Sequence, residues 1–236
     1  MDERHLERSA NRDESGRNRL RREDLKAGNV QADPFREFVE TIVSGDRATV
    51  IRLLDASPLL ARASADHGAT RQAAKQNFFD QIRHYIYEGD TALHMAAAAY
   101  QTGIADELIA RGADVRARNR RGAEPLHYAV DGGPGLPAWS PSAQVQIIAT
   151  LIRAGADPNA IDKSGVAPLH RAVRNRCAEA VRALIDGGAD PRTPNRNGST
   201  PLLLATQTTG RSGSGSAEAK AQQNEILRLL AELGAT

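Results

Sequence analysis

The sequence predicts an all-α protein built from stacked repeats, and two observations support this fold class. First, a four-residue motif occurs four times with small variations, as Thr91-Ala92-Leu93-His94, Glu124-Pro125-Leu126-His127, Ala167-Pro168-Leu169-His170 and Thr200-Pro201-Leu202-Leu203. Second, 33 residues separate His94 from His127, and the same number separates His170 from Leu203. A fixed period of this length is typical of repeat arrays, in which each unit buries its apolar face against its neighbours.

The motif and its period resemble those of the ankyrin repeat, in which a Thr-Pro-Leu-His turn leads into two antiparallel helices. Each of the first three copies also runs on to a Gly-Ala-Asp triplet, which begins at Gly112, Gly155 or Gly188. The resemblance covers about residues 34–236. It implies an ankyrin repeat solenoid of helix-turn-helix units joined by β-hairpin-like loops.

The N-terminal part of the chain departs from this pattern. Residues 1–33 interleave charges of both signs with few large apolar side chains, so we expect a disordered charged tail. Apolar residues then recur at helical spacing on both sides of Gly45-Asp46, which predicts helix, tight turn and helix over 34–63. This segment resembles a degenerate N-terminal capping repeat, because a terminal unit has one neighbour and tolerates an atypical sequence.

Residues 64–89 fit no repeat, and we expect them to form a helical insertion. Helical spacing relates five of its apolar and aromatic residues, Phe78, Phe79, Ile82, Tyr85 and Ile86. Asp80 and His84 would then share one helix face. They could form an acid–base or metal site, although no known ligand signature surrounds them.

Four full ankyrin units are predicted after the insertion, over residues 88–118, 119–161, 162–194 and 195–236. The second unit contains a Pro/Gly-rich insertion with the only tryptophan, Trp139, and the fourth contains a Gly/Ser-rich interruption over 210–216. Trp139 either packs this loop onto the array or stays exposed as an anchor for a partner. The resemblance gives the motif histidines a structural role at the turns. In stacked units they would lie about 10 Å apart, too far to share a metal ion.

Composition narrows the functional classes. The 236-residue chain carries 31 basic and 29 acidic residues, which gives a formal net charge of +2 at pH 7. This near balance disfavours a dedicated nucleic-acid or membrane-surface protein, and no apolar stretch is long enough to span a bilayer. With one cysteine, Cys177, and no secretory signal at its start, the chain is expected to be cytoplasmic. Heavy use of arginine and alanine is typical of GC-rich bacterial genomes.

The sequence contains no phosphate-binding loop, no Gly-x-Ser-x-Gly motif and no Cys-x-x-Cys pair, so we expect no enzyme, cofactor or metal. The resemblance implies instead that a partner protein docks on the turn tips and on the exposed side of the first helices. Transferred by position, the predicted partner-binding residues are Arg118, Arg120, Arg121, Tyr128, Asp131, Lys163, Arg171, Arg174, Asn175 and Arg196.

This set is rich in arginine, whose planar fork binds carboxylates through two hydrogen bonds and stacks on aromatic rings. We therefore expect an unidentified protein partner with an acidic or acidic-aromatic surface. Two alternatives remain open. One is an enzyme or small-ligand-binding protein with its site on the 64–89 insertion. The other is nucleic-acid binding through the arginine-rich tips, which the near-neutral net charge disfavours.

Overall fold

The computed structural model describes residues 33–207 and 215–234. Nearly all of the predicted tail and most of the Gly/Ser-rich interruption lie outside the described residues. The chain divides into Met1–Pro34 and Phe35–Thr236, and the architecture below is that of the second part.

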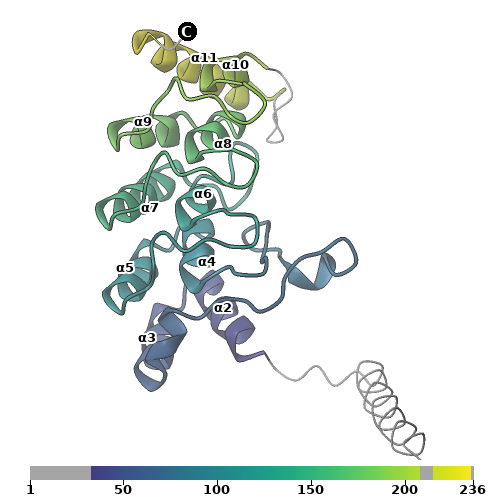
Figure 1. Cartoon of the computed structure of the whole chain (residues 1–236), viewed down its shortest axis with the longest axis vertical. Coiled ribbons are helices and arrows are strands. Elements are labelled where there is room, and N and C mark those ends of the chain that lie inside the picture. The colour runs from purple at the N-terminus through teal and green to yellow at the C-terminus, as the bar shows by residue number, and fades with distance from the viewer. Residues whose placement is uncertain (1–32, 208–214, 235–236) are drawn as a thin grey trace, which may run out of the picture. The chain divides into compact units, whose positions relative to one another are not determined.

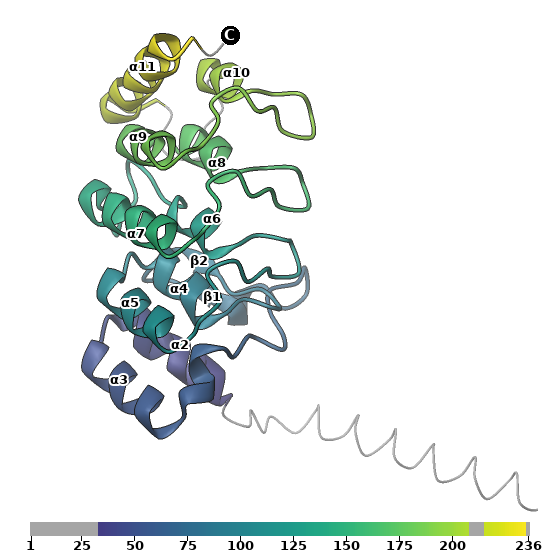
Figure 2. The same cartoon turned by 60° about the vertical axis from the view of Figure 1, so that its left-hand side comes forward.

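The described residues form a helical repeat stack, which confirms the predicted fold class. Ten α-helices among them pack in five successive pairs: α2 (Pro34–Ser44) with α3 (Arg47–Ala56), α4 (Ala92–Ala98) with α5 (Thr102–Ala110), α6 (Pro125–Ala129) with α7 (Pro141–Arg153), α8 (Pro168–Arg174) with α9 (Ala178–Asp186), and α10 (Pro201–Thr206) with α11 (Ala217–Glu232). Figures 1 and 2 show the even-numbered helices stacked in an inner layer and the odd-numbered helices in an outer layer.

Local signals explain where these helices begin and end. Five helices begin at a proline, where the missing N–H costs no hydrogen bond. Side-chain oxygens of Asp46, Ser140, Thr200 and Ser216 accept hydrogen bonds from the first turns of α3, α7, α10 and α11. Eight of the ten described helices have 11 residues or fewer, and α6 has only five. Helices of this length are not stable alone, so packing between units must hold them.

One continuous core runs through the stack. The small inner-helix residues are fully buried, which allows neighbouring helices to approach closely: Ala96, Ala129, Ala172 and Ala205. Larger apolar side chains such as Leu93, Leu126 and Leu169 fill the space between the layers. Because each unit completes its core with atoms of the next, stability is shared along the stack.

The motif histidines fix the entry into each inner helix. In every case Nδ1 accepts a hydrogen bond, at 3.1 Å, from the backbone N–H of the residue that precedes the helix, which is Thr91, Glu124 or Ala167. An accepting Nδ1 requires the ring hydrogen to be on Nε2. The predicted structural role of these histidines is therefore confirmed at the level of the turn.

The same histidines differ in how they link neighbouring units. Nε2 of His94 donates to the carbonyl of Ala123, and Nε2 of His127 donates to the carbonyl of Val166, both at 3.0 Å. Nε2 of His170 is buried and makes no hydrogen bond of regular geometry among the described residues. Burial lowers the pKa of His170, and backbone groups of Thr193 and Ser199 in the next unit partly offset this effect. The first two links therefore join successive units through regular hydrogen bonds, whereas the third histidine has only weaker backbone contacts with the next unit.

The turn tips between units are β-hairpin-like. The second, third and fourth tips, numbered by the full unit that each belongs to, begin at Asn119, Asp162 and Asn195. Each of these residues donates a backbone hydrogen bond to the carbonyl four residues later. The side-chain oxygen of the same residue accepts two backbone N–H groups within the tip. Backbone bonds also join successive tips, as from Lys163 N to the Arg121 carbonyl at 2.9 Å. The tips therefore form a row of fixed loops along one side of the stack.

The predicted helix in the 64–89 insertion is wrong. This segment follows a 3-10 helix, η1 (Pro58–Ala61), and contains a second one, η2 (Lys75–Asn77), before the antiparallel strands β1 (Phe78–Phe79) and β2 (His84–Tyr85). Phe78 pairs with Tyr85 in the ladder, and their rings lie 4.6 Å apart. The backbone turns at Arg83, whose φ of 53° is incompatible with a right-handed helix.

This correction also removes the predicted Asp80–His84 pair. Asp80 is exposed in the turn and lies 3.5 Å from Arg83. His84 lies in β2, and its ring contacts Asp131 and Tyr128 of the second full unit instead. The two residues therefore do not form a joint acid–base or metal site.

Candidate protein-binding groove

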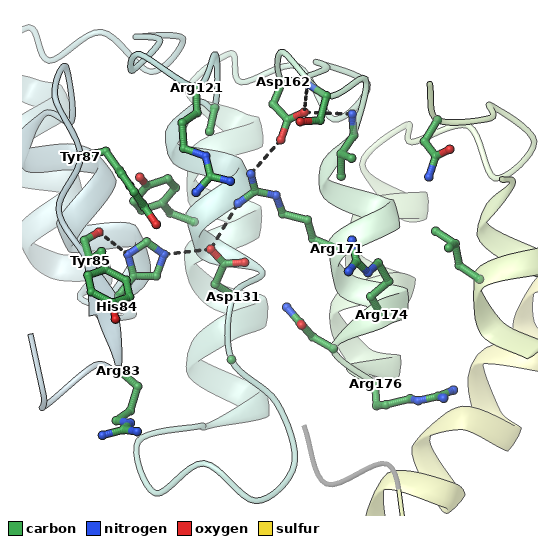
Figure 3. Close-up of a pocket in the computed structure, with 18 of the residues that line it drawn as sticks. Arg83, His84, Tyr85, Tyr87, Arg121, Asp131, Asp162, Arg171, Arg174 and Arg176 are labelled. Carbon is green, nitrogen blue, oxygen red and sulfur yellow. Dashed lines mark hydrogen bonds and ion pairs between the residues drawn. The ribbon is translucent and has the colours of Figure 1, made fainter. Parts of the chain in front are cut away.

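A groove of about 720 Å³ lies where the turn tips, the inner helices and the insertion meet (Figure 3). The insertion forms one end through Arg83, His84, Tyr85 and Tyr87. Residues of α6, α8 and the tips form the middle, and α10 with the fourth tip forms the other end. A volume of this size is in the range of binding pockets for small molecules or short peptide segments.

A network of charged side chains forms the middle of the groove. Arg171 donates from its two Nη atoms to Oδ2 of Asp131 at 3.3 Å and to Oδ2 of Asp162 at 3.0 Å. Its burial lowers the pKa of Arg171, but the charges of both aspartates outweigh this effect and raise it. Burial likewise opposes ionisation of the two aspartates, yet Arg171 holds the pKa of each below its ordinary value. Both carboxylates are therefore charged and already paired.

His84 connects the insertion to this network. Its Nε2 lies 3.0 Å from Oδ2 of Asp131, and its Nδ1 lies 2.7 Å from the carbonyl oxygen of Tyr85. Both partners only accept hydrogen bonds, so both ring nitrogens must donate, which requires the charged imidazolium. Burial lowers the pKa of His84, but the hydrogen bond and the charge of Asp131 outweigh this effect and raise the pKa above its ordinary value. The insertion is thus bound to the second full unit by an ion pair.

The groove carries excess positive charge. Its lining contains five arginines, Arg83, Arg121, Arg171, Arg174 and Arg176, against the two aspartates Asp131 and Asp162. Arg171 is paired with both aspartates. The buried Arg176 donates to the carbonyls of Ala205 and Gln207 at the end of α10. The positive charge available to a partner therefore comes from the other three arginines.

Arg121 and Arg174 are exposed, and neither forms an ion pair within the part of the chain that the structure describes. The guanidinium of Arg121 lies 4.9 Å from the ring centre of Tyr87, a cation–π contact that leaves its N–H groups free to bind. Figure 3 shows Arg121 and Arg174 on either side of Arg171.

The structure brings six of the ten predicted partner-binding residues together in the groove lining: Arg121, Tyr128, Asp131, Arg171, Arg174 and Asn175. The other four lie outside the lining. Arg118 donates to the carbonyls of Gly122 and Ile161, which joins two tips. Arg120 donates to the Ala69 carbonyl and so anchors the insertion.

Lys163 and Arg196 are exposed on the third and fourth tips. They are therefore accessible, but they lie beside the groove rather than in its lining.

Tyr128 is a poor candidate for an aromatic anchor, because only 2% of it is exposed. Its hydroxyl donates to Asp90 at 2.9 Å and accepts from Asn119 at 2.9 Å. Burial, and then the charge of Asp90, raise the pKa of Tyr128 well above its ordinary value. Tyr128 thus belongs to a buried polar network under the groove.

The sequence-based set misses the contribution of the insertion, namely Arg83, His84, Tyr85 and Tyr87. The signal was present as the short run Arg-His-Tyr-Ile-Tyr over 83–87, which combines aromatic rings with a β-branched residue. In strands, such aromatic-rich runs are common. Read as a strand, the run would have predicted a rigid element with side chains on two faces.

Trp139 packs against the core, and its indole N–H donates to Gln144 at 3.1 Å. The Pro/Gly-rich loop that carries Trp139 is therefore attached to the start of α7. This observation favours the packing interpretation over an exposed anchor.

Cys177 is fully buried, its thiol donates to the Gly132 carbonyl at 3.3 Å, and burial raises its pKa far above the ordinary range. Within residues 33–207 and 215–234, no group of three or more potential ligands is arranged to hold a metal ion. No helix in these ranges has the length and apolar character required to cross a bilayer.

Comparison with known proteins agrees with this architecture. A family model described as ankyrin repeats (3 copies) matches residues 44–135 and 138–236. A search of the curated proteins finds no match. The matched residues make up most of the chain and include every helix from α3 to α11, so the protein belongs to the ankyrin repeat family.

Proposed function

We propose that this protein is a non-enzymatic recognition module that binds a partner protein in the groove between the turn tips and the inner helices. Ankyrin repeats generally serve in protein–protein interaction. One observation supports the location most strongly: three arginines, Arg83, Arg121 and Arg174, line a groove whose carboxylates are already paired. A partner with an acidic or acidic-aromatic surface complements this charge.

The proposed contacts refine the set predicted from position. Arg121 and Arg174 supply exposed guanidinium groups, and Asn175 supplies a side-chain amide at the rim, although it also donates to the Val130 carbonyl at 2.9 Å. Asp131 and Arg171 shape the middle of the groove. Because the two are bonded to each other, we expect them to position neighbouring groups and to contribute little net charge to the partner.

Affinity purification from the native host, followed by quantitative mass spectrometry, tests the proposal. The double charge reversal Arg121→Glu/Arg174→Glu should reduce recovery of the partner at least about tenfold, because two attractive contacts become repulsive. The matched control is Arg52→Glu/Lys220→Glu, which makes the same charge change on exposed sites of α3 and α11 outside the groove.

Equal recovery of the partner with both double variants would place the binding surface elsewhere. Circular dichroism of each variant, compared with the unaltered chain, establishes that any loss of binding does not come from unfolding.

Two other functions have weaker support. A ligand site on the insertion alone loses its basis because Asp80 and His84 lie apart and His84 is paired with Asp131. Nucleic-acid binding would use the same arginines, but the formal net charge is only +2. A phosphate-binding protein would lose affinity steeply with salt, so a salt titration separates the two classes of partner.

A further inference from the structure

We propose that the 64–89 insertion is a built-in part of the partner site, and that it adapts the groove to a short, extended, acidic polypeptide segment. This inference rests on the proposed function. It specifies which part of the inner face is open to a partner, and it specifies the chemistry and length of the segment that fits there.

The insertion covers the inner face of the first two full units. His84 contacts the ring of Tyr128 at 4.4 Å and pairs with Asp131 just after α6. Ser64 forms a β-bridge with Thr91 at the start of α4. In keeping with this cover, every residue of α4 and of α6 is buried.

The inner face of the last two units is open by comparison. Arg174 of α8 and Gln207, which follows α10, are exposed and line the groove. A partner segment can therefore lie along α8 and α10, but it meets the insertion before it reaches α4. The groove has one closed end and one open end.

The closed end contributes binding groups of its own. Tyr87 stacks against Arg121 of the second tip, which restricts this guanidinium while its N–H groups stay free. Arg83 at the turn of the insertion has 56% of its side chain exposed, and its single ion pair, with the still more exposed Asp80, is long at 3.5 Å. Such an exposed pair is weak and competes poorly with a bound carboxylate.

The charge pattern selects an acidic segment. The five arginines, the imidazolium of His84 and the two aspartates of the lining give a formal charge of +4, and its three available cations come from the insertion, a tip and α8. Neighbouring units are about 10 Å apart, and an extended chain advances about 3.3 Å per residue. Carboxylates two or three residues apart along a strand could therefore reach cations on successive units. A groove of about 720 Å³ accommodates only a few such residues.

Fluorescence anisotropy with a defined probe tests this proposal on the full chain. The probe is a fluorescein-labelled octapeptide of alternating Glu and Ser, and its control has Gln in place of each Glu. We expect the Glu peptide to bind at least about tenfold more tightly. Arg174→Glu reports on the groove, Arg83→Glu on the insertion, and Arg71→Glu is the control, because Arg71 is exposed in the same insertion but outside the lining.

Arg174→Glu and Arg83→Glu should each weaken binding of the Glu peptide about 5- to 30-fold, whereas Arg71→Glu should change it less than about twofold. If Arg174→Glu weakens binding but Arg83→Glu acts like Arg71→Glu, the insertion is not part of the site. The inference then fails, while the proposed function is untouched.

Two further outcomes would also overturn the inference. One is equal binding of the Glu and Gln peptides, or binding of neither. The other is displacement of the Glu peptide by an oligothymidylate more effectively than by unlabelled Glu peptide, which would assign the groove to nucleic acid. The partner recovery measured with Arg121→Glu/Arg174→Glu decides the proposed function separately in each case.

Discussion

The number of hydrogen bonds made by each motif histidine should determine how much its removal destabilises the stack. His127 accepts from the Glu124 N–H at 3.1 Å and donates to the Val166 carbonyl at 3.0 Å. His170 makes the first bond, but its Nε2 has only weaker contacts with the backbone of Thr193 and Ser199. The two substitutions His127→Ala and His170→Ala therefore remove side chains of the same size but different numbers of contacts.

The expected magnitudes follow from these contacts. Each hydrogen bond contributes about 1 kcal/mol, and truncating a buried ring to a methyl group costs about 2 kcal/mol more. His127→Ala should thus lower the free energy of unfolding by about 4 kcal/mol, and His170→Ala by about 3 kcal/mol. For a chain of this size, the difference of about 1 kcal/mol corresponds to about 2–4 °C in Tm.

Urea unfolding followed by circular dichroism at neutral pH measures both values. His94→Ala is the internal control, since His94 makes both bonds and a third with the Thr91 hydroxyl at 2.9 Å, and it should destabilise the stack at least as much as His127→Ala. Equal m-values would show that the variants report on the same unfolding unit. The reasoning is refuted if His170→Ala is as destabilising as His127→Ala, or if His94→Ala is the mildest of the three.

Three further predictions concern acid, backbone strain and thiol reactivity. Burial lowers the pKa of His127 from 6.5 to about 4. Stability that is present above pH 6.5 should therefore be lost as the pH falls towards 4, and the loss reaches about 3 kcal/mol. His127→Asn should show a smaller pH dependence of the free energy of unfolding. Gly165 and Gly198 occupy the same tip position at φ of 69° and 75°, but an added Cβ would lie 2.9 Å from Arg196 N only at Gly165. Gly165→Ala should therefore lower Tm more than Gly198→Ala, and equal shifts would contradict the structure. Cys177 should react with a thiol reagent only in denaturant, and rapid labelling of the native protein would contradict its burial.

The repeat stack could be predicted from the sequence because the motif residues act locally. Pro168 begins a helix, Leu169 enters the core beside it and His170 bonds to the preceding N–H, all within four residues. Residues that act within one turn produce the same pattern in every unit, and the period of 33 residues makes it visible. The exact unit boundaries stay predictions.

The insertion could not be predicted in the same way, because its conformation depends on distant contacts. Phe79 and Ile86 are compatible with either a helix or a hairpin by spacing alone. The hairpin is stabilised by burial of both side chains, and its strand β2 places His84 against Asp131, which is 47 residues away in the sequence. No local signal specifies that ion pair.

The candidate site was partly predictable for a similar reason. Position within the repeat identifies Arg118, Arg120 and Arg121 as tip residues, but it does not show which of them is available. Arg118 and Arg120 donate to carbonyls of neighbouring segments, and Arg121 alone of the three lines the groove. Which arginine is free depends on the insertion and on the next tip, whose positions follow from packing.

Hydrogen–deuterium exchange of the full chain, alone and with its captured partner, tests the central claim most directly. Binding in the groove predicts slower exchange in residues 83–87, in the tips around Arg121 and Asp162, and along α8 and α10. The outer helices α5, α7 and α9 should be unchanged. Protection confined to these outer helices, with the groove unaffected, would contradict the account.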